Sequence, residues 1–436
     1  MDGWGKATGF VQRTRKLSPY DFLVLMTVGQ AGMKHPSLAG MVDAIAVPMT
    51  REAMHARFTP KAEAYLETCL QYALRERIDG ASALQAASLE PFRRVLIFDS
   101  SSWDVNPQLS AILPGSGGGA SAANCKLQAC YEYKQGELGL FRIEPGTRPD
   151  NAYTNQLPLF LQAGDLALFD QGYFKLETLS QIEKKGAFFL TRFYVGTALR
   201  DAHTSTSIGL EDLLSHLPDN AYQFQVILGG HCGKEEIGCR LICLRVSQQV
   251  ANERRRKMLK TAKRKGRTPS QSRLALCDWT LLVTNSPEAC LPLEKAWPLY
   301  TLRWQIELLF KQLKSVFFIH RSNTKSVSRL KCEIYGKLIL AVLVNRIHAY
   351  ANNRLWNQKR RELSFDKFYK RIQERAFALL ALLLLSAQQA TRYLLAEIQR
   401  LTKNCLKLRQ RSKQTTLEAI EGIAELCAEK FTSALT

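Results

Sequence analysis

The sequence predicts an α/β protein: a core that mixes strands and helices, a β-rich insertion in that core, and all-helical domains at both ends of the chain. Two observations predict this architecture. Apolar positions at helical spacing dominate the N-terminal and C-terminal parts of the chain. Short β-rich runs and helical segments lie between them. The predicted domains are 1–90 (helical), 91–194 (first part of the core), 195–290 (β-rich insertion), 291–330 (rest of the core) and 331–436 (helical).

The composition fits a large folded protein with an anionic partner. The chain has 436 residues, of which 46% are hydrophobic, which is enough for a large core with satellite domains. Sixty Lys and Arg residues against 39 Asp and Glu residues give a net charge of +21, and the excess is spread over several segments. A polyanion is therefore the expected partner, with an ordinary soluble basic protein as the alternative.

The cysteines and the apolar runs argue against a disulfide framework, a zinc site and a membrane span. Eleven cysteines at irregular spacings, with no secretory leader, indicate reduced thiols in a cytosolic compartment. The group His231, Cys232, Cys239 and Cys243 lacks paired Cys-x-x-Cys spacing, so buried structural cysteines are the preferred interpretation. The longest apolar run, Ala376 to Ala387, is about half a bilayer span and predicts a buried helix.

The first domain contains a candidate helix-turn-helix over residues 36–58. Val47-Pro48-Met49 breaks the helical pattern, and Thr50 can cap a second helix. A recognition helix presents side chains that reach phosphates or base edges. Because two short helices joined by any proline turn look similar, a plain helical hairpin is an equally good interpretation. The candidate DNA contacts are Arg51, His55 and Arg57.

Alternating elements between residues 91 and 194 predict the α/β layer. Three β-rich runs joined by loops come first and suggest an antiparallel start. A short helix, a buried strand, a longer helix and another strand follow, which is typical of an α/β layer. The predicted strands are 93–99, 126–133, 137–143, 165–170 and 187–193, and the predicted helices are 155–162 and 173–185.

The insertion adds three β-like runs and a basic arm. The runs are YQFQVILGG, IGCRLICLRV and WTLLVTN, and the arm covers residues 252–267. Nine of its sixteen residues are Lys or Arg. A folded core cannot use that density, so we expect the arm to be exposed and mobile until it meets a polyanion, with a solvated linker as the alternative. The candidate DNA contacts in the arm are Arg254, Arg255, Arg256, Lys257, Lys263, Arg264 and Lys265.

The stretch YTLRWQIELLFKQLK, residues 300–314, carries the most informative pattern. Tyr300, Arg303, Glu307 and Lys314 follow at spacings of three, four and seven, which places them on one stripe of a single predicted helix. A carboxylate flanked by Arg and Lys is typical of a metal ligand beside phosphate-binding cations. An adjoining apolar face is expected to pack against the rest of the protein. It consists of Leu302, Ile306, Leu309 and Leu313.

Three carboxylates stand out by their location. Asp99 and Asp170 each end a predicted strand, and Glu307 lies on the predicted helix. A single strand-end aspartate is more often a cap or turn residue than a ligand. Three carboxylates together can hold two divalent cations about 3.5–4 Å apart. Oxygen ligands without Cys or His indicate Mg²⁺ or Mn²⁺.

These residues resemble the bacterial DDE transposases of the insertion-sequence-four family. The third motif of that family is Tyr, two residues, Arg, three residues, Glu, six residues, Lys, and residues 300–314 contain it in full. The resemblance covers about Arg94 to Lys314, including FDSSSW, LFDQGYF and DWTLLVTN. It implies a ribonuclease-H-like mixed sheet core, interrupted by the β-rich insertion and flanked by DNA-binding and multimerising helices.

The resemblance also implies roles for individual residues. Asp99, Asp170 and Glu307 would be the catalytic metal ligands. Gln171 stands where the family's second motif frequently has Arg, which leaves the phosphate contact of that position unassigned. The residues that would hold the DNA end are Arg303 and Lys314 at terminal phosphates and Tyr300 at the transferred strand end. The tryptophan that would stack on a flipped base during hairpin formation is Trp279, with Trp297 and Trp304 as competitors.

The implied activity is DNA strand transfer. The chain would cut DNA at the ends of an insertion sequence, form hairpin intermediates and join the 3′-hydroxyl ends to target DNA, each step being an in-line phosphoryl transfer. The implied partner is double-stranded DNA, bound by a homodimer in the bacterial cytoplasm at the nucleoid, without a membrane. The C-terminal helices, including an amphipathic stretch over 416–431, are candidates for multimerisation. The alternatives are an inactive or domesticated DNA-binding relative and a metal-dependent nuclease without strand transfer.

Overall fold

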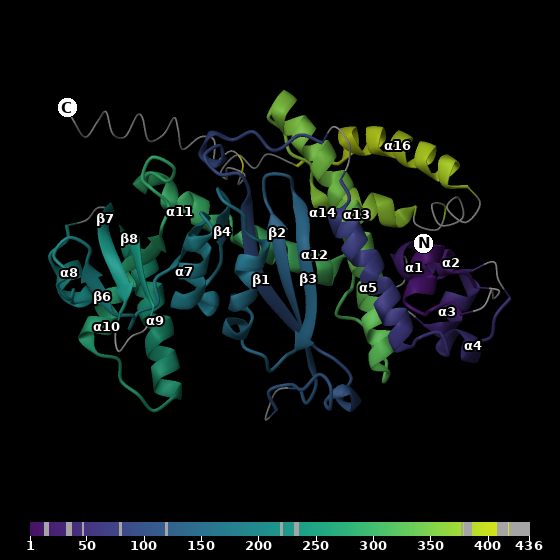
Figure 1. Ribbon diagram of the computed structural model, residues 1–436, viewed down its shortest axis with the longest axis horizontal. Coiled ribbons are helices and arrows are strands. Elements are labelled where there is room, and N and C mark those ends of the chain that lie inside the picture. The colour runs from purple at the N-terminus through teal and green to yellow at the C-terminus, as the bar shows by residue number, and fades with distance from the viewer. Residues whose placement is uncertain are drawn as a thin grey trace. The chain divides into compact units, whose positions relative to one another are not determined.

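The structure, a computed structural model (Figure 1), describes residues 1–12, 17–31, 37–45, 48–77, 81–117, 121–218, 221–230, 235–375, 378, 386–407 and 417. The features expected at His231 and Cys232, in most of 376–387 and in most of 416–431 lie outside the described residues. The chain forms two compact units. Unit 1 comprises Met1–Gln85, Asp99–Arg148 and Gln305–Lys413, and unit 2 comprises Ala86–Phe98, Pro149–Trp304 and Gln414–Thr436.

The N-terminal part of unit 1 consists of helices. They are α1 (Asp2–Ala7), α2 (Pro19–Val24), the π-helical turn η1 (Leu25–Gly29), α3 (Leu38–Asp43), α4 (Arg51–His55) and α5 (Pro60–Arg75). Side-chain caps fix their starts: Ser18 and Asp21 form a capping box at α2, and Thr59 accepts a hydrogen bond from the backbone of α5. Tyr65 donates a hydrogen bond to Pro19 O (2.9 Å), which joins α5 to α2.

The long helix α13 (Val327–Lys359) organises the core of unit 1. It packs against α5, η1 and the strand β3 (Glu137–Pro145). Its apolar run 338–344 is largely buried, as expected of a core helix. Gly336 allows the closest approach, because a Cβ at this position would lie 1.9 Å from Met26 O of η1. A side chain at residue 336 would therefore force α13 and η1 apart.

Unit 1 also holds an antiparallel strand pair, β2 (Asn124–Glu132) with β3. The register runs from Cys125 opposite Pro145 to Glu132 opposite Glu137, which confirms the antiparallel start for these two strands. β2 also neighbours β1 (Val95–Asp104), whose first four residues belong to unit 2. Further helices are α12 (Trp304–Ser315, of which Trp304 belongs to unit 2), α14 (Phe365–Glu374) and α16 (Ala387–Asn404).

The sheet of unit 2 begins with the first residues of β1. Its further strands are β4 (Leu166–Leu168), β5 (Phe188–Arg192), β6 (Leu199–Asp201), β7 (Ala221–Gly229), β8 (Glu236–Arg245) and β9 (Trp279–Thr284). β1 pairs in parallel with β4, and β4 pairs in parallel with β5. β9 then pairs antiparallel with β5, and β8, β7 and β6 follow in antiparallel order. The β-rich insertion therefore extends the sheet of this unit.

Helices and short turns connect the strands of unit 2. The helices are α6 (Leu157–Phe160), α7 (Leu176–Lys184), α8 (Leu210–Ser215), α9 (Gln248–Arg264), α10 (Gln271–Ala275) and α11 (Leu293–Thr301). α7 packs against β5 and β8, and α11 packs against β5 and β7. Single 3₁₀ turns in the two units lie at Ala87–Leu89, Pro107–Leu109, Asp150–Ala152, Thr154–Gln156, Gln171–Tyr173 and Leu276–Asp278.

The strands and helices make the protein a mixed α/β protein, which is the predicted class. One expectation is not met: most of the basic arm, predicted as a mobile segment, forms the regular helix α9. The reason is that Arg254 and Arg255 bind polar groups of the same unit, at Trp279 O and Asp278. In the described ranges, no helix combines the length and the apolar composition that a membrane span requires.

The described cysteines are free thiols, and all of them except the half-buried Cys290 are buried. Burial raises the pKa of Cys125 and of Cys243 to about 12, so these thiols stay protonated and unreactive at neutral pH. Cys239 and Cys243 lie in the buried part of β8. The interpretation as structural cysteines is therefore confirmed for these two residues.

Candidate active site

Asp99 lies where β1 leaves the apolar interior. Val95 to Phe98 are buried, whereas the side chains of Asp99, Ser100 and Ser101 are half-buried. The backbone N–H of Ser100 donates a hydrogen bond to Asp99 Oδ1 (2.8 Å) and orients the carboxylate. The sequence predicts that the strand ends at Asp99, but β1, which neighbours β2, continues to Asp104.

Glu307 lies in the first turn of α12, in the same unit as Asp99. Its side chain is exposed, and a carboxylate is favourable near the positive end of the helix dipole. The predicted apolar face that adjoins it is buried. Each residue of the predicted apolar face is at most 5% exposed, namely Leu302, Ile306, Leu309 and Leu313.

Lys314 joins α12 to β1. Its ammonium Nζ donates a hydrogen bond to Ser102 O (3.0 Å) and lies 5.9 Å from the centre of the Trp103 ring, within cation–π range. Burial lowers the pKa of Lys314. The elements that carry Asp99 and Glu307 therefore both have their carboxylates in unit 1. The hydrogen bond from Lys314 to Ser102 O helps to hold these two elements together.

Asp170 lies in unit 2, two residues after β4. Its Oδ1 accepts a hydrogen bond from Gly172 N (2.9 Å) and caps the following 3₁₀ turn. Two contacts tie this turn to the end of β5: Gln171 Nε2 donates to Phe193 O (2.9 Å), and Thr191 Oγ1 donates to Asp170 O (3.5 Å). Gln171, where the sequence departs from the family pattern, thus holds the loop that carries Asp170.

Tyr300 is buried among charged groups of unit 2 and is 4% exposed. The Arg192 guanidinium carbon lies 5.9 Å from the centre of its ring. Burial raises the pKa of Tyr300, the positive charges of Arg192 and Arg303 oppose the rise, and the negative charge of Asp170 adds to it. These four residues therefore share one electrostatic environment. The motif pattern does not single out Arg192; its position at the end of β5, beside the Asp170 loop, is the signal that could have found it.

The single helical stripe predicted for residues 300–314 is wrong, because two helices share this segment. α11 ends at Thr301 and α12 begins at Trp304. Leu302 N bonds to Leu299 O and Arg303 N bonds to Tyr300 O, both at 3.1 Å. These i to i−3 bonds tighten the chain into a turn and interrupt the α-helical phase. Tyr300 and Glu307 consequently lie on different helices.

The three candidate metal ligands are divided between the units. Asp99 and Glu307 belong to unit 1, and Asp170 belongs to unit 2. In the part of the chain that the structure describes, no group of three or more His, Cys, Asp or Glu side chains is arranged to hold a metal ion. The donor chemistry nevertheless fits a hard divalent cation, because all three are carboxylates and none of them is buried.

The three candidate tryptophans differ in exposure. Trp279 is 5% exposed, and the Arg245 guanidinium lies 5.0 Å from the centre of its ring. Trp297 is half-buried, with its ring 6.0 Å from that of Tyr300, whereas Trp304 is 51% exposed. Since Arg245 already covers a face of Trp279, a base could stack there only after this guanidinium moves away.

The predicted recognition helix corresponds to α4. Thr50 caps it by accepting a hydrogen bond from Ala53 N (3.2 Å), as the sequence predicts, and α3 packs against it. Val47 of the predicted turn lies outside the described ranges. Arg51 and His55 are exposed, whereas Arg57 follows the helix and is half-buried.

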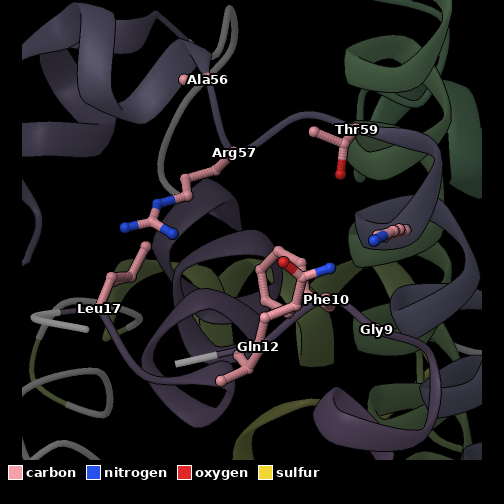
Figure 2. A pocket seen from close by; sticks show the side chains of 9 residues that line it. Gly9, Phe10, Gln12, Leu17, Ala56, Arg57 and Thr59 are labelled. Atoms are coloured by element: carbon pink, nitrogen blue, oxygen red, sulfur yellow. The ribbon is translucent and has the colours of Figure 1, made fainter. Parts of the chain in front are cut away.

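Arg57 lines a cavity of about 170 Å³ between the first helices of unit 1. Figure 2 shows the Arg57 guanidinium just above Leu17 in the view, and Phe10 and Gln12 line the cavity to the right of them. Lys61 also lines this space, so two cations border it. Arg57 therefore faces a partly enclosed space, and Arg51 and His55 are the more accessible of the three candidate DNA contacts.

The basic arm residues fall into two groups. Arg254 donates to Trp279 O (2.8 Å) and Thr280 Oγ1 (2.9 Å), and Arg255 forms an ion pair with Asp278 (2.5 Å). These two candidate DNA contacts are half-buried and engaged within unit 2. The other five candidates are exposed, namely Arg256, Lys257, Lys263, Arg264 and Lys265.

Comparison with known proteins places the chain among transposases. The transposase of insertion sequence element IS231E from Bacillus thuringiensis subsp. finitimus is 28% identical over 445 residues, which cover 98% of this chain and 93% of the relative. The IS231B transposase from Bacillus thuringiensis subsp. berliner is 29% identical over 98% of this chain and 93% of its own length. The IS1151 transposase from Clostridium perfringens is 27% identical over 78% of this chain and 76% of the relative.

A solved structure and a family model complete the comparison. The cryo-EM structure of the piggyBac transposase synaptic complex with hairpin DNA aligns with 95% of this chain and 83% of that chain, with a TM-score of 0.45 and 12% identity. This degree of likeness is too low to assign a shared fold. The model of the transposase DDE domain matches residues 90–343, which is more than half of the chain. This protein therefore belongs to the transposase DDE domain family and is an enzyme of DNA transposition.

Proposed function

We propose that this transposase cuts DNA at the ends of an insertion sequence and joins the freed 3′-hydroxyl ends to target DNA through hairpin intermediates. The observation that carries the proposal is the complete motif from Tyr300 to Lys314 inside the matched DDE domain. The relatives that align with nearly the whole chain are named as transposases of insertion sequence elements. Each step is an in-line phosphoryl transfer, in which positioning and charge neutralisation carry most of the catalysis.

DDE transposases generally use divalent metal ions, and we propose Mg²⁺ or Mn²⁺ with Asp99, Asp170 and Glu307 as ligands. Three carboxylates without Cys or His favour these hard ions over zinc. When bound, such ions stabilise the negative charge that develops on the reacting phosphate oxygens. The protein contributes the positions of the carboxylates: Ser100 N orients Asp99, and the 3₁₀ turn after β4 orients Asp170.

Cations near these carboxylates would hold the DNA end. Arg303 and Lys314 would bind terminal phosphates, and Tyr300 would contact the transferred strand end. The contact of Lys314 with Ser102 O uses one of the three donors of an ammonium, so this lysine could bind β1 and a phosphate together. Trp279 would stack on a flipped base once Arg245 has left its ring.

The domain roles that follow are also proposals. Domain 1–90 would bind DNA through Arg51, His55 and Arg57. Segments 91–194 and 291–330 would form a ribonuclease-H-like catalytic core, and domain 331–436 would hold a homodimer together on DNA. The parallel pairing of β1 with β4 and of β4 with β5 supports such a core. The site of action would be the bacterial nucleoid.

Substitution of the carboxylates tests the proposal. Labelled duplexes that carry the ends of the element are incubated with the protein and Mg²⁺. We expect Asp99→Ala, Asp170→Ala and Glu307→Ala each to abolish cleavage and to leave binding of the ends measurable, because a ligand is lost without loss of the basic surface. Asp104→Asn is the matched control, since Asp104 is an exposed carboxylate on the same strand as Asp99.

The outcome distinguishes the proposal from its alternatives. Cleavage retained by any of the three alanine variants would refute that residue as a ligand. Cleavage by the wild type without joined products would identify a nuclease that lacks strand transfer. Binding without cleavage by the wild type would identify a DNA-binding relative without catalytic activity.

A further inference from the structure

Helix α9 has two sides with different chemistry. Successive residues of an α-helix are rotated by about 100°, so the basic residues of α9 divide between opposite sides. The inner side, as we define it, consists of Ala251, Arg254 and Arg255. The outer side consists of Arg256, Lys260, Lys263 and Arg264.

The inner side attaches the helix to the sheet of unit 2. Ala251 is 1% exposed. Arg254 bonds to Trp279 O and Thr280 Oγ1 at the start of β9, and Arg255 pairs with Asp278. Burial lowers the pKa of Arg254, which is the expected cost of placing a guanidinium against a sheet. These contacts fix α9 as a rigid element and leave its other side to solvent.

The outer side is a row of exposed cations. In residues 235–375, all of which the structure describes, none of the four outer side chains has a hydrogen bond or an ion pair. Glu253 is the one carboxylate in the sequence of the arm. The eight steps from Arg256 to Arg264 span about 12 Å at 1.5 Å per residue. A duplex presents roughly seven phosphates over that length, since it carries one charge per about 1.7 Å.

We propose that the outer side of α9 binds the backbone phosphates of duplex DNA as a rigid contact that does not read sequence, while Arg254 and Arg255 hold the helix in place. The inference deepens the proposed function and rests on it, because DNA is the substrate in both. It changes the set of candidate DNA contacts in the arm in two ways. Arg254 and Arg255 become positioning residues, and Lys260, absent from the sequence-based candidates, becomes a phosphate contact.

The test compares two variants that lose the same charge. The outer-side variant is R256Q/K260Q/K263Q/R264Q, and the control is R354Q/K359Q/R361Q/K370Q, which removes four exposed cations of α13, α14 and the segment between them in unit 1. Affinity for a random-sequence duplex is measured by fluorescence anisotropy from about 50 to about 200 mM salt. Each lost phosphate contact lowers the slope of log K against log salt by about one.

We expect the outer-side variant to lower that slope by about three to four, and the control to lower it by less than one. Both variants should unfold at the temperature of the wild type. Arg254→Gln should instead lower the unfolding temperature, because it removes two bonds to β9. An outer-side variant with the slope of the wild type, or a control with an equal loss, would overturn the proposal.

A parallel assay separates this inference from the proposed function. Wild-type cleavage of the element ends in Mg²⁺ is measured on the same preparation. If the wild type cleaves and the outer-side variant keeps its salt slope, only the α9 inference fails. If the slope falls as expected and the wild type never cleaves, only the proposed function fails.

Discussion

Several side chains of the candidate site bind main-chain carbonyls that are distant in sequence. Lys314 reaches Ser102 O across 212 positions, Gln171 reaches Phe193 O across 22, and Arg254 reaches Trp279 O across 25. Every residue has a main-chain carbonyl, so no sequence pattern indicates which carbonyl a given side chain will bind. The residue types of the site could therefore be predicted from motifs, whereas the contacts that orient them could not.

Gln171 provides a prediction at this scale. Gln171→Ala removes the bond to Phe193 O and loosens the loop that carries Asp170. We expect cleavage to slow by about tenfold or more, because small displacements of a catalytic group have large effects on rate. Single-turnover cleavage of element ends measures the effect. The matched control is Gln181→Ala on α7, an exposed glutamine; equal rates for the two variants would contradict the positioning role.

Lys337 predicts a pH-dependent stability. It donates to Phe318 O (2.9 Å) and Arg321 O (3.3 Å), and burial lowers its pKa to about 8, opposed by Glu333 one turn earlier. An unfolded lysine titrates higher, so between pH 8 and 10 the unfolded chain binds more protons and stability rises with pH.

We expect the wild type to gain about 2 kcal/mol relative to Lys337→Met over this interval. Denaturant titrations at each pH measure the free energy of unfolding of both proteins. Other groups that titrate in this range cancel in the comparison. A difference that does not change with pH would show that Lys337 titrates normally.

At the scale of elements, hydrophobic periodicity and capping residues were the reliable signals. The predicted apolar face over residues 302–313 and the cap at Thr50 follow from side chains close in sequence. The break between α11 and α12 was missed because the apolar spacing continues across residues 302 and 303, while the backbone there tightens to i−3 bonds. The helix α9 was missed because its inner side is stabilised by contacts with β9 and the turn before it, and not by an apolar stripe.

Gly336 provides a prediction for the packing of elements. Gly336→Ala places a methyl group 1.9 Å from Met26 O. This oxygen belongs to the backbone, so it can move away only if the backbone of η1 shifts. We expect a loss of about 1–3 kcal/mol or more in the free energy of unfolding, measured by thermal and denaturant unfolding. Gly3→Ala in α1 is the control, because nothing lies within 4 Å of the added carbon. Its expected effect is neutral or stabilising by up to about 1 kcal/mol.

At the scale of the whole molecule, the alternation of strands and helices gave the α/β class correctly. The sequence also grouped residues 195–290 as β-rich, and the pairing of β9 with β5 shows that they share a sheet with the core strands. Strand pairing of this kind depends on contacts between residues nearly a hundred positions apart, such as Leu190 and Thr284. Local patterns predict the strands but not their neighbours.

Metal dependence is the prediction for the complete enzyme. We expect EDTA to stop cleavage of element ends, Mg²⁺ or Mn²⁺ to restore it, and Zn²⁺ alone to leave it absent, because all proposed ligands are carboxylates. Gel-based cleavage assays measure product, and anisotropy in EDTA confirms that the DNA stays bound. Full cleavage in EDTA, or rescue by Zn²⁺ alone, would contradict the ligand set.

The bond from Lys314 to Ser102 O has an evolutionary consequence. Its acceptor belongs to the backbone, so any amino acid at position 102 preserves it. Mutations that replace Ser102 leave the hydrogen bond intact. For the same reason, no substitution at position 102 can suppress a defect caused by the loss of Lys314. Divergent descendants of this gene should accordingly drift at 102 while retaining a long basic side chain at 314.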